Sequence, residues 1–183
     1  YDFYKSTMVY TDAEPNEAHK ALAKLEKLGK LKAVVTQNID NLHERAGSRR
    51  IIHLHGELTK VCSSRDPYNP HYIKELKPDE YEVKFGDKAG DGTQLRPFIV
   101  WFGEPVPEIE TAVNYVEKAD IFVIIGTSMN VYPAAGLLNY VPREAEVYLI
   151  DPKPVDVHSM RRIHVIQKGA SEGVRELRSL LQS

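Results

Sequence analysis

Three apolar runs of the chain are each followed by side chains that could bind a polar ligand. Val35 leads into Thr36-Gln37-Asn38-Ile39-Asp40, Ile125 into Gly126-Thr127-Ser128, and Ile150 into Asp151. Amides, hydroxyls and carboxylates can bind ribose and phosphate groups, and a glycine lets the backbone approach a ligand. Each stretch alone is typical of an ordinary turn. Together, at the carboxyl ends of predicted strands, they favour a nucleotide site.

A second candidate for chemistry is the segment His53-Leu54-His55-Gly56. On a strand, a spacing of two residues places both imidazoles on one face. Three interpretations are open at this point. The histidines could be structural, they could share a metal ion, or one could be a general base, since imidazole titrates near neutral pH. The spacing does not choose among them.

The elements that would position these groups alternate between helix and strand. Apolar spacings of three and four predict helices over 17–28, 107–118, 133–139 and 171–181. Apolar runs predict strands over 32–36, 51–58, 121–125 and 146–150, and a short strand centred on Val165. Residues 121–125 are apolar on both faces, as in a parallel sheet covered by helices. The alternation predicts an α/β fold with a Rossmann-like, doubly wound parallel sheet.

Residues 63–93 interrupt this alternation. They are rich in Pro, Asp, Gly, Lys and Tyr and have little apolar periodicity. We expect a small insert subdomain here, while the remainder of the chain forms the Rossmann-like core.

Composition narrows the class of protein. The chain has 183 residues, of which 27% are charged, and its formal net charge is −2. This balance gives no electrostatic reason to expect nucleic acid or an anionic membrane as a partner. No apolar stretch approaches the length of a membrane span. The single cysteine, Cys62, excludes an intrachain disulfide and is typical of a reducing compartment, so we expect a cytoplasmic protein.

Four segments occur in an order that resembles one enzyme family. They are TQNIDNLHERAG (36–47), HLHGEL (53–58), LRPFIVWFGEPVP (95–107) and GTSMNVYPAAGL (126–137). Together they make the chain similar to the sirtuins, which are NAD-dependent protein deacylases. The resemblance implies NAD as co-substrate. It also implies removal of an acyl group from a protein lysine, with nicotinamide and O-acyl-ADP-ribose as products.

The resemblance implies roles for the residues at the nicotinamide end of NAD. His55 would be the general base, which deprotonates a ribose hydroxyl after the acyl oxygen has displaced nicotinamide. Gln37 and Asn38 would contact the nicotinamide ribose and help to place the reacting groups. Asp40 would bind the nicotinamide carboxamide. His53 does not match the catalytic position, and we expect it to be structural.

The resemblance also implies contacts with the rest of NAD and with the substrate. The residues for the ADP-ribose half are Gly126, Thr127, Ser128 and Asp151. An acyl-lysine peptide would bind as an added strand along Val100, Phe102, Gly103 and Glu104, with Val131 on its other side. Many sirtuins have Asn in place of Asp151; the carboxylate can only accept hydrogen bonds. We expect Trp101 to pack in the core.

The chain departs from the sirtuin pattern in two places. The glycine-rich GAGxS turn of the family does not precede Tyr1. We therefore expect an N-terminally incomplete catalytic domain over 1–183, whose activity on its own is doubtful. Most sirtuins also have two Cys-x-x-Cys pairs that bind zinc, whereas Cys62 stands alone here and Arg65 takes the second place. We expect no zinc; the alternative is a site of Cys62, His71 and aspartates.

Two other functions could use the same pocket. A mono-ADP-ribosyltransferase would need only a different acceptor, and a non-catalytic module would only bind NAD or ADP-ribose. The joint presence of His55, Asn38 and Asp40 argues against the module, because binding alone requires no base.

Overall fold

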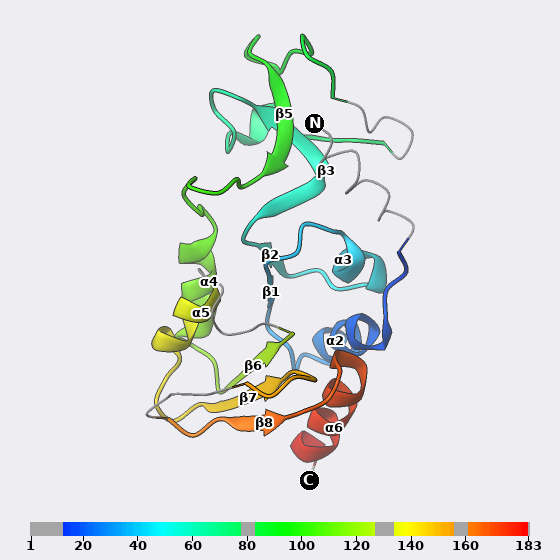
Figure 1. The fold of residues 1–183 in the computed structure, drawn as a ribbon, viewed down its shortest axis with the longest axis vertical. Helices are drawn as coiled ribbons and strands as arrows, with labels where there is room; N and C mark the ends of the chain where they lie inside the picture. The colour runs from blue at the N-terminus through cyan, green and yellow to red at the C-terminus, as the bar shows by residue number, and fades with distance from the viewer. Residues whose placement is uncertain (1–12, 78–82, 127–133, 156–160, 183) are drawn as a thin grey trace.

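The computed structural model describes residues 13–77, 83–126, 134–155 and 161–182 (Figure 1). Its helices are α2 (Glu17–Lys27), α3 (Leu42–Ala46), α4 (Ile109–Val116), α5 (Ala134–Leu137) and α6 (Ala170–Gln182), with 3-10 turns η2 (Pro70–Tyr72) and η3 (Leu138–Tyr140). Its strands are β1 (Val34–Thr36), β2 (Ile51–His53), β3 (Gly56–Ser63), β4 (Lys74–Glu75), β5 (Leu95–Ile99), β6 (Ile121–Ile125), β7 (Glu146–Ile150) and β8 (His164–Ile166). In this part of the chain no helix is long and apolar enough to cross a membrane.

The parallel strands of the described residues form two groups. β1 pairs with β2, and β6, β7 and β8 form a second sheet in that order. Ile125 of β6 lies opposite Ile150 of β7, so the carboxyl ends of these two strands are side by side. The molecule is an α/β protein with a Rossmann-like core, as the sequence predicts.

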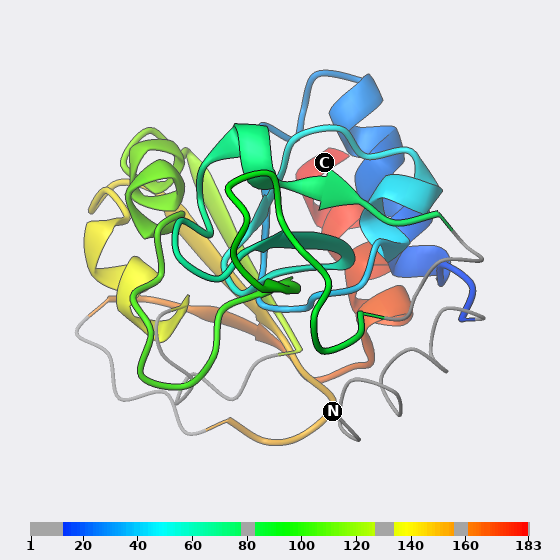
Figure 2. The same cartoon turned by 90° about the horizontal axis from the view of Figure 1, so that it is seen from above.

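Helices cover both faces of the β6–β8 sheet. Figures 1 and 2 show α4 and α5 on one side of it and α2 and α6 on the other. The first side is packed by one cluster of buried residues, among them Leu54, Ala112, Val116, Ile124, Leu137, Val147 and Leu149. This cluster also includes Ile52, so it joins the β1–β2 pair to the larger sheet. The second side is packed by Ala18, Ile150, Ile166, Val174 and Leu177.

Helices α2 and α6 are positioned by identifiable local features. Asn16 caps α2: its side chain accepts the N–H of His19 at 3.0 Å, and His19 Nδ1 accepts the N–H of Asn16 at 3.0 Å. Gly173 lets α6 approach β7 closely, because a Cβ there would overlap Cγ2 of Ile150 and lie 3.3 Å from its Cβ. The absence of a side chain at position 173 therefore sets the helix-to-sheet distance.

The third sheet is antiparallel and lies beyond the Rossmann-like core, at the top of Figure 1. Its strand order is β4-β3-β5, so β5 is at an edge of the described sheet. The predicted single strand over 51–58 is wrong. The chain turns between β2 and β3, where Gly56 has φ 87°, a value that interrupts a strand. Most of residues 63–93 belong to this end of the molecule, and the insert boundaries stay a prediction.

A hydrogen-bonded network ties this end together. The hydroxyl of Ser63, which is fully buried, donates to Asp91 Oδ2 at 2.6 Å and lies 2.9 Å from Thr93 Oγ1. The same hydroxyl accepts the backbone N–H groups of Arg65 and Asp66 at 3.1 and 3.0 Å. The hydrogen bonds that Asp91 accepts from Ser63, foremost, and from Thr93 lower its pKa to about 2. The network links the end of β3 to the turn before β5.

Candidate active site

Two adjacent strand ends place the predicted nicotinamide-side residues together. Thr36 of β1 lies opposite His53 of β2, and the N–H of Leu54 donates to the carbonyl of Thr36 at 3.0 Å. Because the strands are parallel, the segment 37–40 and the turn at His55 leave the sheet on the same side. The structure therefore brings together residues that are about fifteen positions apart in sequence.

His55 is oriented by the loop that it faces. Its Nδ1 lies 3.1 Å from the carbonyl oxygen of Gln37. A carbonyl can only accept, so Nδ1 carries the hydrogen, and in the neutral ring Nε2 then keeps a lone pair. On the other side, the carbonyl of His55 accepts the N–H of Val100 at 2.8 Å. The ring is half-buried and held in the tautomer that a general base needs.

Gly56 lets the paired strands β3 and β5 approach closely beside His55. A Cβ at position 56 would overlap the carbonyl oxygen of Phe98 and lie 2.9 Å from Ile99 Cα. The space that a side chain would fill is therefore taken by the backbone of β5. This close approach fixes the distance between His55 and the segment that begins at Val100.

The side chains of Gln37, Asn38 and Asp40 differ in their surroundings. Asn38 is exposed, and its backbone N–H donates to Thr36 Oγ1 at 3.0 Å. Gln37 Oε1 is buried and has no hydrogen-bond partner among the residues that the structure describes. Asp40 Oδ1 accepts the N–H of Leu42 at 3.0 Å, which fixes the carboxylate at the start of α3. The loop thus holds an exposed amide and a fixed carboxylate, and that carboxylate interacts electrostatically with His19 and His43.

The predicted contacts for the ADP-ribose half lie at the ends of β6 and β7. Gly126 has φ 64°, and its N–H donates to the carbonyl of Ile150 at 3.0 Å. Asp151 follows on the adjacent strand, and its Oδ1 accepts the N–H of Lys153 at 2.8 Å. The two residues are therefore neighbours at one edge of the sheet. Thr127, Ser128 and Val131 lie outside the described residues.

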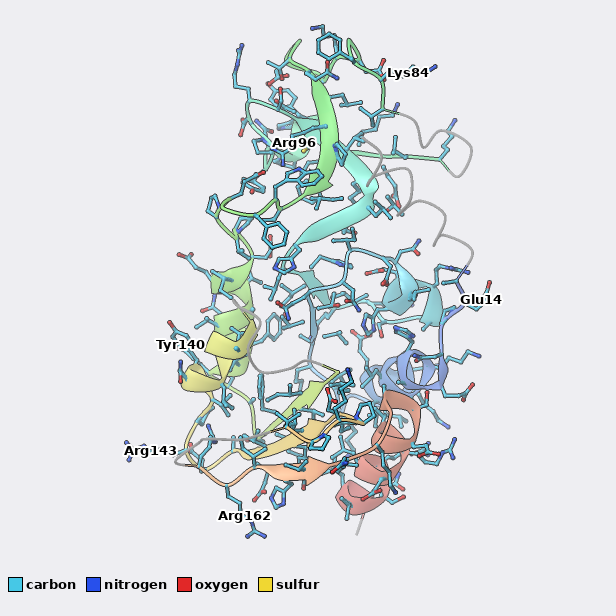
Figure 3. The ribbon with its side chains drawn as sticks, in the orientation of Figure 1. Glu14, Lys84, Arg96, Tyr140, Arg143 and Arg162 are labelled. Atoms are coloured by element: carbon cyan, nitrogen blue, oxygen red, sulfur yellow. The ribbon has the colours of Figure 1, made fainter. Side chains whose placement is uncertain are left out.

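The predicted substrate segment 100–104 forms a turn after β5. Phe102 is fully exposed, and Gly103 has φ 86°. Glu104 Oε1 pairs with Arg96 Nη2 at 2.9 Å, so its carboxylate braces the turn against β5, where Figure 3 labels Arg96. The prediction that Trp101 packs in the core is wrong: its exposed fraction is 41%, because it lies in this turn and not on the strand.

Comparisons with known proteins decide the family. The sequence model of the Sir2 family matches residues 1–133. An NAD-dependent protein deacylase of Bacteroides thetaiotaomicron is 79% identical over 170 residues, which cover 93% of this chain and 72% of the relative. This chain belongs to the Sir2 family.

Solved Sir2 structures share the fold. A mutant Sir2 homologue in complex with ADP-ribose is 36% identical, covers 98% of this chain and 74% of its own, and has a TM-score of 0.81. A Sir2 structure with a p53 peptide and NAD⁺ is 30% identical, covers 93% and 71% of the two chains, and has a TM-score of 0.74. These neighbours contain the kinds of ligand that the Sir2 resemblance implies.

The residues of this chain do not fit the tetrahedral zinc site that two Cys-x-x-Cys pairs form in most sirtuins. Cys62 is buried, and burial raises the pKa of its thiol to about 11, whereas zinc binds the thiolate. The Cys62 Sγ lies 3.8 Å from the carbonyl oxygen of Pro97, which suits a protonated thiol. Next to it, Ser63 is occupied by the network with Asp91. The absence of zinc stays a prediction, which elemental analysis of the purified protein tests.

A different group of possible ligand atoms comes from Glu44, His53 and Glu57, within 4.8 Å of one another. His53 Nε2 lies 2.6 Å from Glu44 Oε1, which is a hydrogen-bond distance. Two ligands of one zinc ion are about 3 Å or more apart, given metal–ligand bonds of about 2.0–2.2 Å. The distance between His53 Nε2 and Glu44 Oε1 is therefore that of a hydrogen bond, and it is too short for two ligands of one zinc ion.

The sequence analysis missed α3 and the contacts that it makes with His53. We predicted only a polar turn over 36–47, yet residues 42–46 are helical and end at Gly47, where φ is 106°. Asp40 and the N-cap residue Asn41 before the helix, and Gly47 after it, are the signals that could have predicted it. Glu44 of this helix became a candidate only when the structure placed it against His53.

Proposed function

We propose that this chain is an NAD-dependent protein deacylase, which transfers the acyl group of a protein lysine to ADP-ribose and releases nicotinamide. The names of its Sir2 relatives support this function. The observation that carries it in this chain is the hydrogen bond between His55 Nδ1 and the carbonyl of Gln37, which leaves Nε2 able to accept a proton. A module that only binds nucleotide has no need of such a base.

The roles that we propose for the loop residues are those that the Sir2 resemblance implies. Bound NAD supplies the ribose carbon that the acyl oxygen attacks as nicotinamide leaves. Asp40 accepts the carboxamide N–H of nicotinamide, and the exposed amide of Asn38 holds the ribose, with Gln37 beside it. Positive charge develops on the ribose as the glycosidic bond breaks, and these fixed dipoles and the carboxylate stabilise it. His55 Nε2 then takes the proton of the ribose hydroxyl.

The ADP-ribose half of NAD would bind at the second pair of strand ends. Gly126 offers close backbone approach, and Thr127 and Ser128 offer hydroxyls. Asp151 would accept a hydrogen bond from a ribose hydroxyl. The shared hydrophobic cluster that joins β1–β2 to β6–β8 supports one continuous site across both strand pairs.

A protein or peptide is the second substrate, and we propose that it adds as a strand along residues 100–104. β5 lies at the edge of its described sheet, which leaves backbone groups for an added strand. Phe102 is fully exposed in the turn that follows this edge strand, where it would contact the peptide beside Val100 and Gly103. Val131 would flank the peptide on its other side. Glu104 would act through its pairing with Arg96.

The test is stoichiometric release of nicotinamide with an acetyl-lysine peptide, which should stop when either NAD or the peptide is omitted. In His55→Gln, turnover should fall about 10²- to 10⁴-fold while NAD still binds, because the base acts after binding. Near-normal turnover in this variant would exclude His55 as the base. Transfer of ADP-ribose to a protein without loss of acyl groups would indicate the transferase instead.

A further inference from the structure

His53 makes contacts that the mechanism above does not use. Its side chain is only 7% exposed and lies between the loop, α3 and β3. Nδ1 is 3.2 Å from the carbonyl oxygen of Asn38, and Nε2 is 2.6 Å from Glu44 Oε1 and 4.0 Å from Glu57 Oε1. Both ring nitrogens therefore face oxygen atoms.

These partners limit the protonation state of the ring. The Asn38 carbonyl has no hydrogen to donate, so Nδ1 must be the donor. An ionised Glu44 can likewise only accept, so Nε2 must also be a donor. A neutral imidazole has one N–H group and could satisfy only one of the two contacts. Two simultaneous hydrogen bonds require the imidazolium form.

We propose that His53 is a positioning residue that acts as an imidazolium, joining the backbone of Asn38 to the carboxylate of Glu44. The loop that carries Asn38 and Asp40 is thereby tied to α3 through a charged ring. His55 holds the preceding residue of the same loop through the carbonyl of Gln37. The two histidines of HLHG thus have complementary roles, because one donates from both nitrogens and the other keeps a lone pair.

The charges around the ring favour this state. Burial acts to lower the pKa of His53, but Glu44, Glu57 and the Asn38 carbonyl outweigh it, and the pKa is raised above its ordinary value. Burial acts to raise the pKa of Glu44, but the hydrogen bond to His53 and the charge of that ring outweigh it. The net effect lowers the pKa of Glu44, which favours the ionised carboxylate. His43 of α3 also interacts electrostatically with His53, and burial foremost lowers the pKa of His43.

The sign of the pH dependence follows from the raised pKa. The tie is complete below the unfolded pKa of about 6.5 and is lost as pH rises through the folded pKa of His53. Lys60 Nζ lies 2.8 Å from Glu57 Oε2, so a cation also faces one of the carboxylates beside the ring.

The protonation state can be measured without any activity. In protein with ¹⁵N-labelled histidine, with chelator present, we expect both ring nitrogens of His53 to be protonated at pH 7, with assignment by His53→Gln. Glu44→Gln should lower the pH at which His53 titrates. A neutral His53 ring at pH 7, with one bare nitrogen, would overturn the proposal whether or not the protein is a deacylase.

The positioning role rests on the proposed function and is tested by kinetics. His53→Gln should raise the KM for NAD roughly tenfold or more, since a charge-assisted bond to the loop is lost. Partial unfolding alone would lower kcat and leave KM unchanged. Glu44→Gln should move the alkaline fall of kcat/KM to lower pH.

The chain provides a matched control. His164 Nε2 lies 2.6 Å from Glu146 Oε2, the same His–Glu contact, but on β8 and β7. His164→Gln should leave the KM for NAD unchanged. An equal rise of KM in His164→Gln, or no rise in His53→Gln, would refute the positioning role. If the unmodified protein shows no deacylation, the proposed function is refuted, whereas the measured protonation of the His53 ring is unaffected.

Discussion

Adding one methyl group at Gly56 should disturb the pairing of β3 with β5, on which the active site depends. Gly56 has φ 87°, and a Cβ there would overlap the carbonyl oxygen of Phe98. The obstructing atoms belong to backbone, so they cannot move aside as the end of a flexible side chain could. Gly56→Ala must therefore shift β5 relative to β3, and with it the N–H of Val100 that binds the carbonyl of His55.

The free-energy cost of Gly56→Ala has two parts. A left-handed backbone costs a non-glycine residue about 1–2 kcal/mol. Overpacking against neighbours that cannot yield adds about 1–3 kcal/mol. Gly29 isolates the first part, because it has φ 74° but nothing within 4 Å of the position of a Cβ. The expected excess of Gly56→Ala over Gly29→Ala is about 2 kcal/mol in the free energy of unfolding.

Urea denaturation followed by circular dichroism measures this difference. With a denaturant slope of about 2 kcal/mol/M, the midpoint of Gly56→Ala should lie about 1 M below that of Gly29→Ala. Gly56→Ala should also lose turnover, whereas Gly29→Ala should keep it. Equal midpoints for the two variants would refute the argument that the Phe98 backbone excludes a side chain at position 56.

Three further predictions concern the parts that support the site. Because the pKa of Asp91 is lowered to about 2, its contribution to stability is present above pH about 4 and is lost as pH falls toward 2. The Tm difference between the unmodified protein and Asp91→Asn should therefore shrink below pH about 4, and a constant difference would contradict this. Gly173→Ala should lower Tm by roughly 5 °C through overlap with Ile150. The same substitution should lower Tm by less in an Ile150→Ala background, and equal falls of Tm in the two backgrounds would argue against the contact. Arg96→Met should raise the KM for the peptide more than that for NAD, because the turn loses its brace; equal changes would place Arg96 elsewhere in the mechanism.

Most of the Rossmann-like core could be predicted from the sequence, because its signals are local. The runs over 121–125 and 146–150 match β6 and β7 residue for residue. The helix predicted over 17–28 ends at Lys27. The two strands are apolar on both faces because helices cover both sides of their sheet, and α2 is apolar only along the face that it buries.

The predictions that failed concern features that depend on single residues or on contacts distant in sequence. The predicted strand over 51–58 divides because Gly56 must avoid the Phe98 carbonyl, some forty residues later. α3 has only five residues, too few for a helical period to stand out from the polar turn residues around it. The partners of His53 come from three elements, so no spacing within one of them could predict its protonation state.

The most direct test of the central claim is mass spectrometry of the products formed from NAD and a panel of acetyl- and succinyl-lysine peptides. The account predicts deacylated peptide, nicotinamide and O-acyl-ADP-ribose in equal amounts, with deacylated peptide formed about 10²- to 10⁴-fold more slowly by His55→Gln. Bound NAD with no product from any peptide, or free acyl acid in place of O-acyl-ADP-ribose, would contradict it.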